Sequence, residues 1–422
     1  MNQSRYICNG DCGHCRFVRG SEFCNIEPKE SRFAHKIDNV LTNRWLGLPI
    51  LFVVLFVVFE AAFTLGSYPQ DWIEEGIDIL SVRLLSLLPQ GPLSSLLIDG
   101  VLQGCGSVIA FLPNIIILFF FLSLLEDSGY MARAAFLMDK LMHAIGLHGN
   151  SFIPMLLGFG CNVPAIMAAK SIENRKDRAL TMLMIPFMSC SARLPVYLLF
   201  AAAFFPRHRA LVMIGIYAVG IVLSILFAIV MKSTRFFRKG KDDDVFVLPP
   251  FRLPEGKSLL CHIWDRTKDY LQKITTVILA AAVVIWTLEY FPLQDGHRAA
   301  QEDSCLAHIG QWMEPVMSPL GFDWKMNVCI LTGLPAKEAI VSTMGILYNT
   351  DEGSLASVLA ASGDFTPAAS VGFMLFVLLY FPCIATLRTL RKELGWKWAM
   401  FSACHSVALA WVVAFLVFKL FG

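Results

Sequence analysis

The sequence predicts an all-α, multi-pass membrane protein, and three features of its composition and patterning support that fold class. Hydrophobic residues make up 56% of the 422 residues and charged residues 16%, against about 45–50% and about 25% in soluble domains. Apolar runs recur along the chain, and several are close to the length that crosses about 30 Å of hydrocarbon. The 35 basic and 33 acidic residues nearly cancel, which argues against nucleic-acid binding and leaves the lipid bilayer as the expected partner.

The apolar runs predict seven membrane-spanning helices, each roughly the length of one crossing. A polar N-terminal segment precedes the first of them, without the pattern of a signal peptide. The seven predicted spans are residues 45–66, 102–125, 179–204, 209–231, 273–291, 370–387 and 398–420.

Two further apolar stretches, residues 151–169 and 327–348, carry glycine and proline at their centres. Proline removes a backbone donor and glycine loosens a helix, so an unbroken span is disfavoured in both stretches. Irregular backbone at membrane depth is tolerated where it lines a cavity or is buried in protein. Both stretches are therefore predicted as broken helices or re-entrant hairpins.

The charges of the connecting segments predict a topology. Basic residues are concentrated in 170–178, 232–241 and 388–397, which the positive-inside bias assigns to the cytoplasm together with the basic N-terminus. The acidic segments 67–100 and 349–369 are expected outside. All of these assignments hold together only if the two hairpins enter the membrane from opposite faces.

A weak internal repeat points the same way. An offset of about 175 pairs Gly158 with Gly333, and an offset of about 193 pairs Cys190 with Cys383. Inverted repeats with interrupted helices are typical of transporters, whose substrate site lies where the breaks meet. The predicted organisation is a cytoplasmic Cys-rich segment (1–44), a first span with an outer amphipathic loop (45–100), a first module (101–231), a cytoplasmic linker (232–272), a second module (273–397) and a C-terminal span (398–422).

Polar and sulfur-bearing residues are concentrated at these breaks, where they are costly at membrane depth and are functional candidates by default. Thiol, amide, hydroxyl and carboxylate ligands together suit a borderline cation such as Fe(II) or Zn(II) better than Mg(II) or Ca(II). The predicted pathway residues are Cys161, Asn162, Cys190, Ser191, Glu338 and Cys383, with Glu126, Asp127, Arg193 and Lys337 as secondary candidates.

Each candidate also has a structural interpretation. A cysteine in an apolar helix is commonly a packing residue. Glu338 and Lys337 are adjacent and fit a structural ion pair, and a lysine stem can also extend its charge to the interface. Glu126 and Asp127 end the predicted second span and fit a simple marker of the membrane surface. The sequence leaves these alternatives open.

A second cluster of thiols, Cys8, Cys12, Cys15 and Cys24, lies in the N-terminal segment. Four thiols this close together can close around zinc, iron or an iron–sulfur cluster. The alternative is a disordered, thiol-bearing tail.

Five strings in the chain resemble the membrane domain of FeoB-type ferrous iron transporters, over about residues 30 to 415. The strings are LEDSGYMARAAFLMDKLM (125–142), GFGCNVPAIMA (158–168), MIPFMSCSARLPVY (184–197), GLPAKEAIVSTMGILY (333–348) and FPCIATLRTLRKELGWKW (381–398). The resemblance implies two gate modules related to nucleoside-recognition domains, with Fe²⁺ as the substrate taken up through the bacterial inner membrane. It places the family's metal-path cysteines on Cys161, Cys190 and Cys383, with Glu338 in the AKE motif.

The sequence departs from that family's pattern in one respect. Its members begin with a GTP-binding domain, and no GxxxxGK[ST] phosphate loop occurs in this chain. The chain is therefore predicted to be a transporter and not an enzyme, with GTPase activity on a separate subunit or with a small cytoplasmic accessory protein as partner. The alternative functions are a gate-family permease for a nucleoside-like solute or another divalent metal, and a membrane sensor built on the N-terminal thiols. A homo-oligomer is compatible with the sequence.

Overall fold

Helices build the part of the chain that the computed structural model describes. These residues are 46–87, 91–103, 109–110, 112–234, 256–290, 304–350 and 352–422, with the single residues 41, 43, 89, 106 and 237. The predicted N-terminal metal cluster, Cys8 to Cys24, lies outside the described residues.

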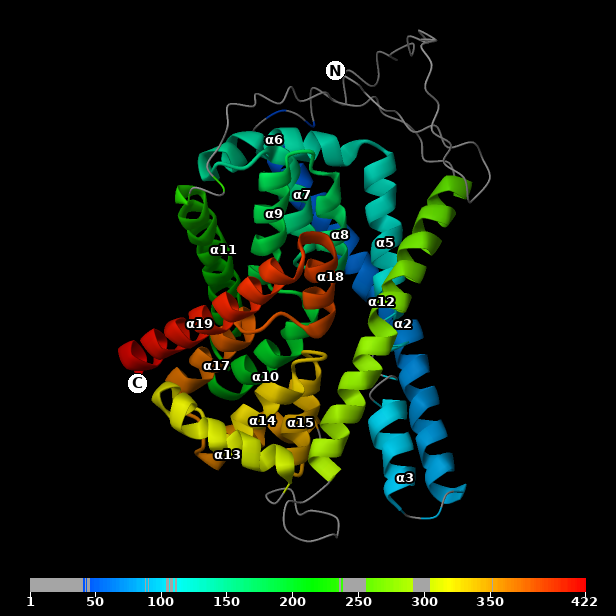
Figure 1. Cartoon of the computed structure of the whole chain (residues 1–422), viewed down its shortest axis with the longest axis vertical. Coiled ribbons are helices and arrows are strands. Elements are labelled where there is room, and N and C mark those ends of the chain that lie inside the picture. The colour runs from blue at the N-terminus through cyan, green and yellow to red at the C-terminus, as the bar shows by residue number, and fades with distance from the viewer. Residues whose placement is uncertain are drawn as a thin grey trace.

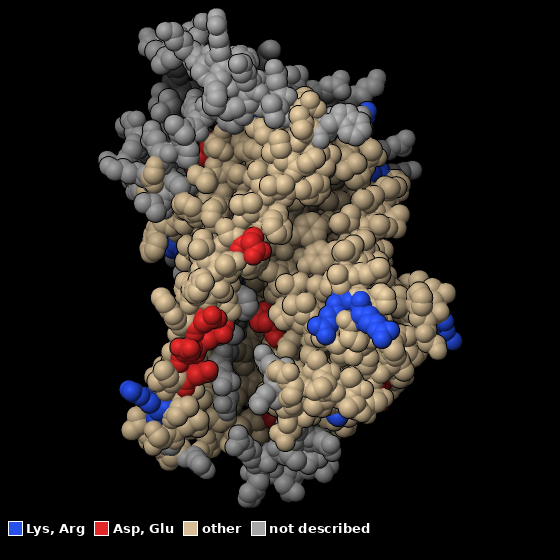
Figure 2. Space-filling view, turned by 180° about the vertical axis from the view of Figure 1, so that it is seen from behind, with Lys and Arg blue, Asp and Glu red and all other residues tan. Residues whose placement is uncertain are grey.

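Five helical stretches of the described chain are long and apolar enough to cross a membrane. They are α2 (Gly47–Leu87), Arg175–Phe204 with α9 (Arg175–Met184) and α10 (Leu194–Phe204), α11 (Arg209–Ser233), Pro367–Leu394 with α17 (Pro367–Leu379) and α18 (Ile384–Leu394), and α19 (Trp396–Phe421). Large apolar side chains, such as Phe56, Ile214 and Leu420, are exposed on α2, α11 and α19. Uncharged side chains cover most of the face in Figure 2. The chain is thus an all-α, multi-pass membrane protein, as predicted.

The helix that contains the first predicted span is longer than that span. α2 continues as one helix past residue 66 to Leu87 and accommodates Pro69 in its interior. Acidic residues alternate with apolar ones at helical spacing in the second half of α2, so the predicted outer loop is largely an amphipathic extension of the span.

The predicted span 102–125 begins in a π-helical segment, η1 (Leu96–Gln103), which follows the short α3 (Pro92–Ser95). Most of its described residues belong to α5 (Leu112–Asp127). The chain then bends by 79° into α6 (Tyr130–Ile145). Gly129 has a φ of 79° at this bend, a conformation that glycine adopts without a steric penalty. Figure 1 shows α6 lying across one end of the molecule.

The long helix α12 (Gly256–Tyr290) covers most of the predicted span 273–291 and begins inside the predicted linker. It packs on α5 and η1 (Figure 1). Its described apolar part, Leu279–Tyr290, is shorter than one crossing, so the count of seven spans remains a prediction.

Both predicted interruptions are present. In the first hairpin, η2 (Gly149–Ser151) and α7 (Phe152–Leu157) are separated from α8 (Asn162–Ala168) by a break at 158–161. In the second, α14 (Trp324–Thr332) is separated from α15 (Ala339–Leu347) by a break at 333–338. The two arms of each hairpin pack against each other.

Ion pairs connect charged segments that lie far apart in the sequence. Lys170 bonds Glu393 at 2.8 Å, and Lys232 bonds Asp177 at 3.2 Å, so the three predicted cytoplasmic segments are tied together. Elsewhere, Lys325 lies 3.6 Å from the carboxylate of Asp364, which belongs to the predicted outer segment 349–369. Figure 1 shows α6 and α13 (Cys305–Met317) at opposite ends. The side of the membrane that each end faces remains a prediction.

The core is centred on α17, whose side chains are buried on almost every face, as expected for a helix at the centre of a bundle. It packs along α19 and also contacts α10, which in turn contacts α16 (Glu352–Ser362). The rings of Phe200 and Phe322 both pack against Phe373 of α17, with centroids 5.0 and 5.5 Å away. Phe322 also packs against Phe376, at 5.5 Å. This rigid centre carries the segment that leads to Cys383.

Candidate functional site

Four of the predicted pathway residues stand at the starts of four helices. Cys161 precedes α8, Cys190 precedes the 3-10 turn η5 (Ser191–Arg193), Glu338 precedes α15 and Cys383 precedes α18. The three cysteines have extended backbone ψ angles of 132° to 160°. The first N–H groups of a helix have no partner within the helix. These four side chains therefore lie next to backbone N–H groups that the helix itself does not pair.

The two breaks are held by the same main-chain hydrogen bond. The N–H of Ser191 donates to Gly160 O, and the N–H of Ile384 donates to Leu334 O, both at 3.2 Å. Ser191 and Ile384 directly follow Cys190 and Cys383, the cysteines that the repeat aligns. The bond therefore places each of these cysteines beside the break of its own module, and the internal repeat extends to backbone contacts.

The breaks line one cavity of about 120 Å³, which has room for an ion with several waters. Side chains or backbone from α2, α5, both hairpins and the segments after Cys190 and Cys383 form its wall. All six predicted pathway residues are among its lining: Cys161, Asn162, Cys190, Ser191, Glu338 and Cys383.

Two buried amide oxygens in this wall have no hydrogen-bond partner within the described part of the chain. Asn162 is 4% exposed and Asn114 is 7% exposed, and the Oδ1 of each is unsatisfied. Leaving a buried acceptor without a partner costs about 1–3 kcal/mol, so a ligand that supplies the partner gains by the same order. The sequence reasoning missed Asn114, although a lone amide in the apolar run LPNIIILFFFL is the signal that identifies it.

Lys337 also lines the cavity but is tied to the protein. It is 2% exposed, its Nζ donates to Phe381 O at 3.0 Å, and it lies 3.1 Å from the centroid of the Tyr380 ring. No ion pair joins it to Glu338 among the described side chains, and it does not extend to the surface. Both structural interpretations of the Lys337–Glu338 pair are therefore wrong.

Three secondary candidates lie apart from the cavity wall. The buried Arg193 donates from Nη1 to Met188 O at 3.0 Å and so supports the loop before Cys190. Glu126 and Asp127 end α5 at the 79° bend, and neither is part of the lining. The structure brings these three side chains near the site's scaffold but not to its cavity.

The cavity combines soft and hard ligands. Thiols come from both modules, and Cys383 Sγ lies 3.0 Å from Thr386 Oγ1. Glu338 supplies the carboxylate, and the two asparagines supply neutral oxygens. Mixed sulfur, carboxylate and amide donors favour a borderline transition-metal ion over Mg²⁺ or Ca²⁺.

Two known families match parts of this chain. Residues 108–204 and 271–397 match the family described as Gate, nucleoside recognition. Residues 213–266 match the ferrous iron transport protein B C terminus. These matches overlap the predicted modules 101–231 and 273–397. No solved structure matches the chain.

Relatives with curated names span several organisms. The chain is 45% identical over 435 residues to a protein of Porphyromonas gingivalis named Fe(2+) transport protein A/Fe(2+) transporter FeoB fusion protein, covering 91% of this chain and 51% of the relative. It is 40% identical to the Fe(2+) transporter FeoB of Campylobacter jejuni, over 92% of this chain and 66% of the relative. For the protein of that name from Methanocaldococcus jannaschii, the identity is 38% and the shares are 90% and 58%.

The chain thus spans about half to two thirds of the length of these relatives. The family matches cover both predicted modules and the segment between them, and the similarity to the relatives runs over nearly the whole of this chain. The chain belongs to the Gate family, and within it to the membrane region shared by FeoB-type proteins.

Proposed function

We propose that this chain forms the membrane pathway for uptake of Fe²⁺, with the cavity at the paired breaks as the site where the ion is bound in transit. The names of the relatives support the choice of ion. The observation that carries the proposal is the meeting of three thiols and one carboxylate, drawn from both modules, at one cavity.

The geometry suits a partly dehydrated ion. The cavity of about 120 Å³ brings the lining close to a bound ion, and lining groups can replace water oxygens that Fe²⁺ loses on binding. Asn162 and Asn114 offer oxygens that have no other partner, the cysteines offer sulfur, and Glu338 offers negative charge. The amine of Lys337 donates to Phe381 O, which keeps its Nζ on the wall.

Substitution of the cavity cysteines tests the proposal. The triple variant Cys161→Ser, Cys190→Ser and Cys383→Ser keeps the size of the side chains and removes the soft ligands. We expect Fe²⁺ uptake into proteoliposomes to fall more than about tenfold, as changes at metal sites commonly cause.

Two other cysteines provide matched controls. Cys329 is buried in α14, and Cys404 is exposed on α19, and neither lines the cavity. Their serine variants should transport as the wild type does. Equal uptake by the triple variant and these controls would contradict the ligand role of the cavity cysteines.

A second candidate is a permease for a nucleoside-like solute, which the description of the Gate family favours. The size of the cavity argues against it, because pockets for drug-sized molecules occupy roughly 300–1,000 Å³. Uptake of labelled iron and of labelled nucleoside in the same vesicles separates the two functions. Nucleoside uptake that depends on Asn162 and Glu338, without iron uptake, would favour the permease. Competition by Zn²⁺ or Mn²⁺ in the same assay tests the remaining alternative, another divalent metal.

The pathway also implies partners and an orientation. We propose that the end carrying 170–178 and 388–397 faces the cytoplasm of a bacterial cell, because it holds the basic segments. We expect a small accessory protein to bind at this end, since the Porphyromonas gingivalis relative is named as a fusion of Fe(2+) transport protein A with the Fe(2+) transporter FeoB. GTP hydrolysis, if used, would come from outside these residues. Labelling of single cysteines placed at Lys176 and Asp364 with a membrane-impermeant reagent tests the orientation: only the cysteine at position 364 should react in intact cells.

A further inference from the structure

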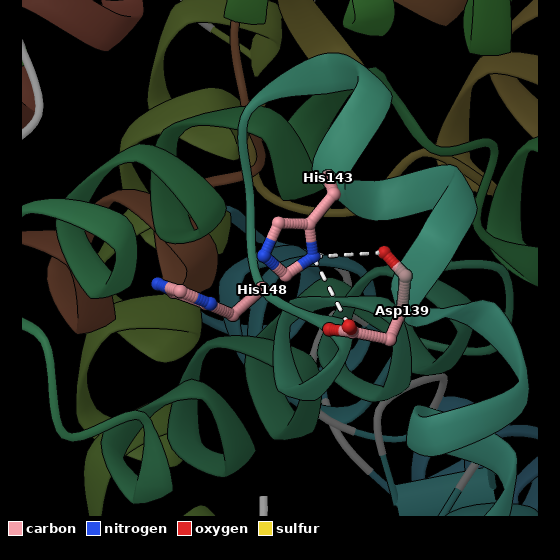
Figure 3. Close-up of side chains that lie close together, drawn as sticks. All are labelled: Asp139, His143 and His148. Atoms are coloured by element: carbon pink, nitrogen blue, oxygen red, sulfur yellow. Dashed lines mark hydrogen bonds and ion pairs between the residues drawn. The ribbon is translucent and has the colours of Figure 1, made fainter. Parts of the chain in front are cut away.

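A compact group of side chains lies away from the cavity, where α6 ends. Asp139 and His143 are four residues apart on α6 and therefore share one face of the helix. His148 follows in the turn to η2. One ligand atom from each of the three side chains lies within 4.8 Å of the other two. Figure 3 shows the three side chains gathered on one side of this turn.

The turn that returns His148 to α6 depends on two glycines. Gly146 ends α6 with a φ of 85°, and a Cβ there would lie 2.8 Å from Lys232 Cδ. A Cβ on Gly149 would overlap the carbonyl oxygen of Ala135. Because both positions exclude a side chain, the backbone packs closely enough to place His148 opposite Asp139 and His143.

Each of the three side chains has a neighbour that fixes its orientation. The N–H of Gly149 donates to Asp139 Oδ1 at 2.7 Å, which leaves Oδ2 directed at His143 Nδ1, 3.1 Å away. His143 Nδ1 also lies 3.1 Å from Asp139 O. On the other side, His148 Nε2 lies 3.3 Å from Asp177 Oδ2.

The outer contacts match those that support metal ligands. A ligating histidine typically bonds a carboxylate or a carbonyl through its second ring nitrogen, which fixes the ring for the metal. The carboxylate of Asp177 lies 3.3 Å from Nε2 of His148 and is itself bonded by Lys232 at 3.2 Å. Asp139 O lies 3.1 Å from Nδ1 of His143, a contact that restrains the ring of this histidine.

We propose that Asp139, His143 and His148 form a second binding site, for a first-row divalent cation. Two histidines and one carboxylate with open positions are the ligand set of non-haem Fe(II) sites. The site is half open, with side-chain exposures of 35% for Asp139 and 47% for His143 against 14% for His148. Solvent can thus supply the remaining ligands.

The position of the site suggests its use. Only α7, whose six residues rise about 9 Å, separates the turn at Gly149–Ser151 from the first break. Asp177 and Lys232 belong to the basic segments that were assigned to the cytoplasm. A cation leaving the cavity toward this end meets the site next, and this role as a station on the exit path rests on the proposed function; the binding itself does not.

Direct measurement of metal binding tests the site without reference to transport. The full chain in nanodiscs is titrated with Mn²⁺ and followed by electron paramagnetic resonance, because Mn²⁺ favours oxygen and nitrogen ligands over the thiols elsewhere in the chain. We expect one bound Mn²⁺ with ¹⁴N couplings from histidine. Both the ¹⁴N couplings and the one bound Mn²⁺ should be lost in the His143→Gln and His148→Gln variants. His143 is largely exposed, so His143→Gln should leave the fold intact.

Control variants keep the result interpretable. His208, an exposed histidine before α11, provides the matched variant His208→Gln, which should bind as the wild type does. Glu338→Gln should retain the ¹⁴N couplings, so a failure of the cavity proposal and a failure of this site are distinguishable. Unchanged stoichiometry and couplings in both cluster variants would overturn the proposal, as would wild-type protein without histidine-coupled Mn²⁺.

Discussion

The first break, residues 158–161, brings a thiol and the adjoining amide to the cavity, whereas the second, residues 333–338, brings an amine and a carboxyl group. Cys161 is the last residue of the first break and Asn162 follows it, and Asn162 Oδ1 has no hydrogen-bond partner among the described residues. Lys337 and Glu338 belong to the second, and Lys337 is bound to Phe381 O and the Tyr380 ring. Each module has its own backbone hydrogen bond of this kind at its break, but the side chains beside the bond differ between the modules. A pseudo-symmetric scaffold thus builds an asymmetric site, in which one break contributes a thiol and an amide and the other contributes an amine and a carboxyl group.

The largest loss of stability is expected from changing Lys337, on which the second break depends. Lys337→Ala removes a buried stem, at about 0.8 kcal/mol for each CH₂, and leaves Phe381 O without its donor, at about 1–3 kcal/mol. We expect a total loss near 4 kcal/mol, measured as the free energy of unfolding in mixed micelles with SDS.

Lys337→Met separates the two contributions, because methionine restores most of the buried stem but not the donor. It should lose only the 1–3 kcal/mol or so of the orphaned carbonyl. A Met variant at least as stable as the wild type would show that the buried charge is a burden on the fold and not a tie between the break and Phe381.

The next effect concerns the helix that supports the first break. A Cβ on Gly66 of α2 would overlap Asn114 Oδ1 and lie 2.9 Å from Asn114 Cα. Gly66→Ala must therefore displace Asn114 from the cavity wall, and overpacking of this kind costs about 1–3 kcal/mol. The same unfolding measurement, together with Fe²⁺ uptake, should show a loss of both.

Gly76 is the matched control on the same helix, because a Cβ there meets nothing within 4 Å. Gly76→Ala should leave uptake unchanged and stabilise the helix by up to about 1 kcal/mol. If both alanine variants behaved alike, the close approach of α2 to Asn114 would have no functional role.

A smaller effect tests the bond that the modules share. In the first module, Ser191 Oγ adds a second donor to Gly160 O at 3.0 Å, and Ile384 has no counterpart in the second. Ser191→Ala removes only this extra bond and keeps the N–H bond, so we expect a loss of about 0.5–1.5 kcal/mol. A loss of several kcal/mol on unfolding would mean that the side chain, and not the repeated backbone bond, holds the break.

Local sequence signals predicted both breaks and six of the residues that line the cavity, because glycine and proline interrupt an apolar run wherever the chain later folds. The cysteines at and after these breaks were predicted as pathway residues from their places in the sequence. The continuation of α2 to Leu87 and the bend at Gly129 were not predicted, since both depend on packing against other helices. The partners of Lys337 lie 43 and 44 residues away in the chain, beyond any local pattern. The return of His148 to Asp139 likewise depends on the left-handed conformation of Gly146.

The smallest effect on stability, with a clear effect on binding, is expected at Asn162. Its buried Oδ1 has no partner in the fold, so an apolar residue of similar size removes an unsatisfied acceptor without breaking a contact to it. Asn162→Leu should therefore unfold within about 1 kcal/mol of the wild type, or be slightly more stable. Fe²⁺ uptake should fall nonetheless, because the cavity loses an oxygen ligand.

That combination separates a ligand from a structural residue. A packing or capping role would lower stability and uptake together, as expected for Gly66→Ala, whereas a group kept for its ligand leaves the fold unharmed when it is removed. Thermal unfolding and uptake measured on the same nanodisc and proteoliposome preparations make the comparison direct. Full uptake by a stable Asn162→Leu variant would remove the amide from the pathway and leave the thiols and Glu338 as the ligands that the first and second breaks contribute.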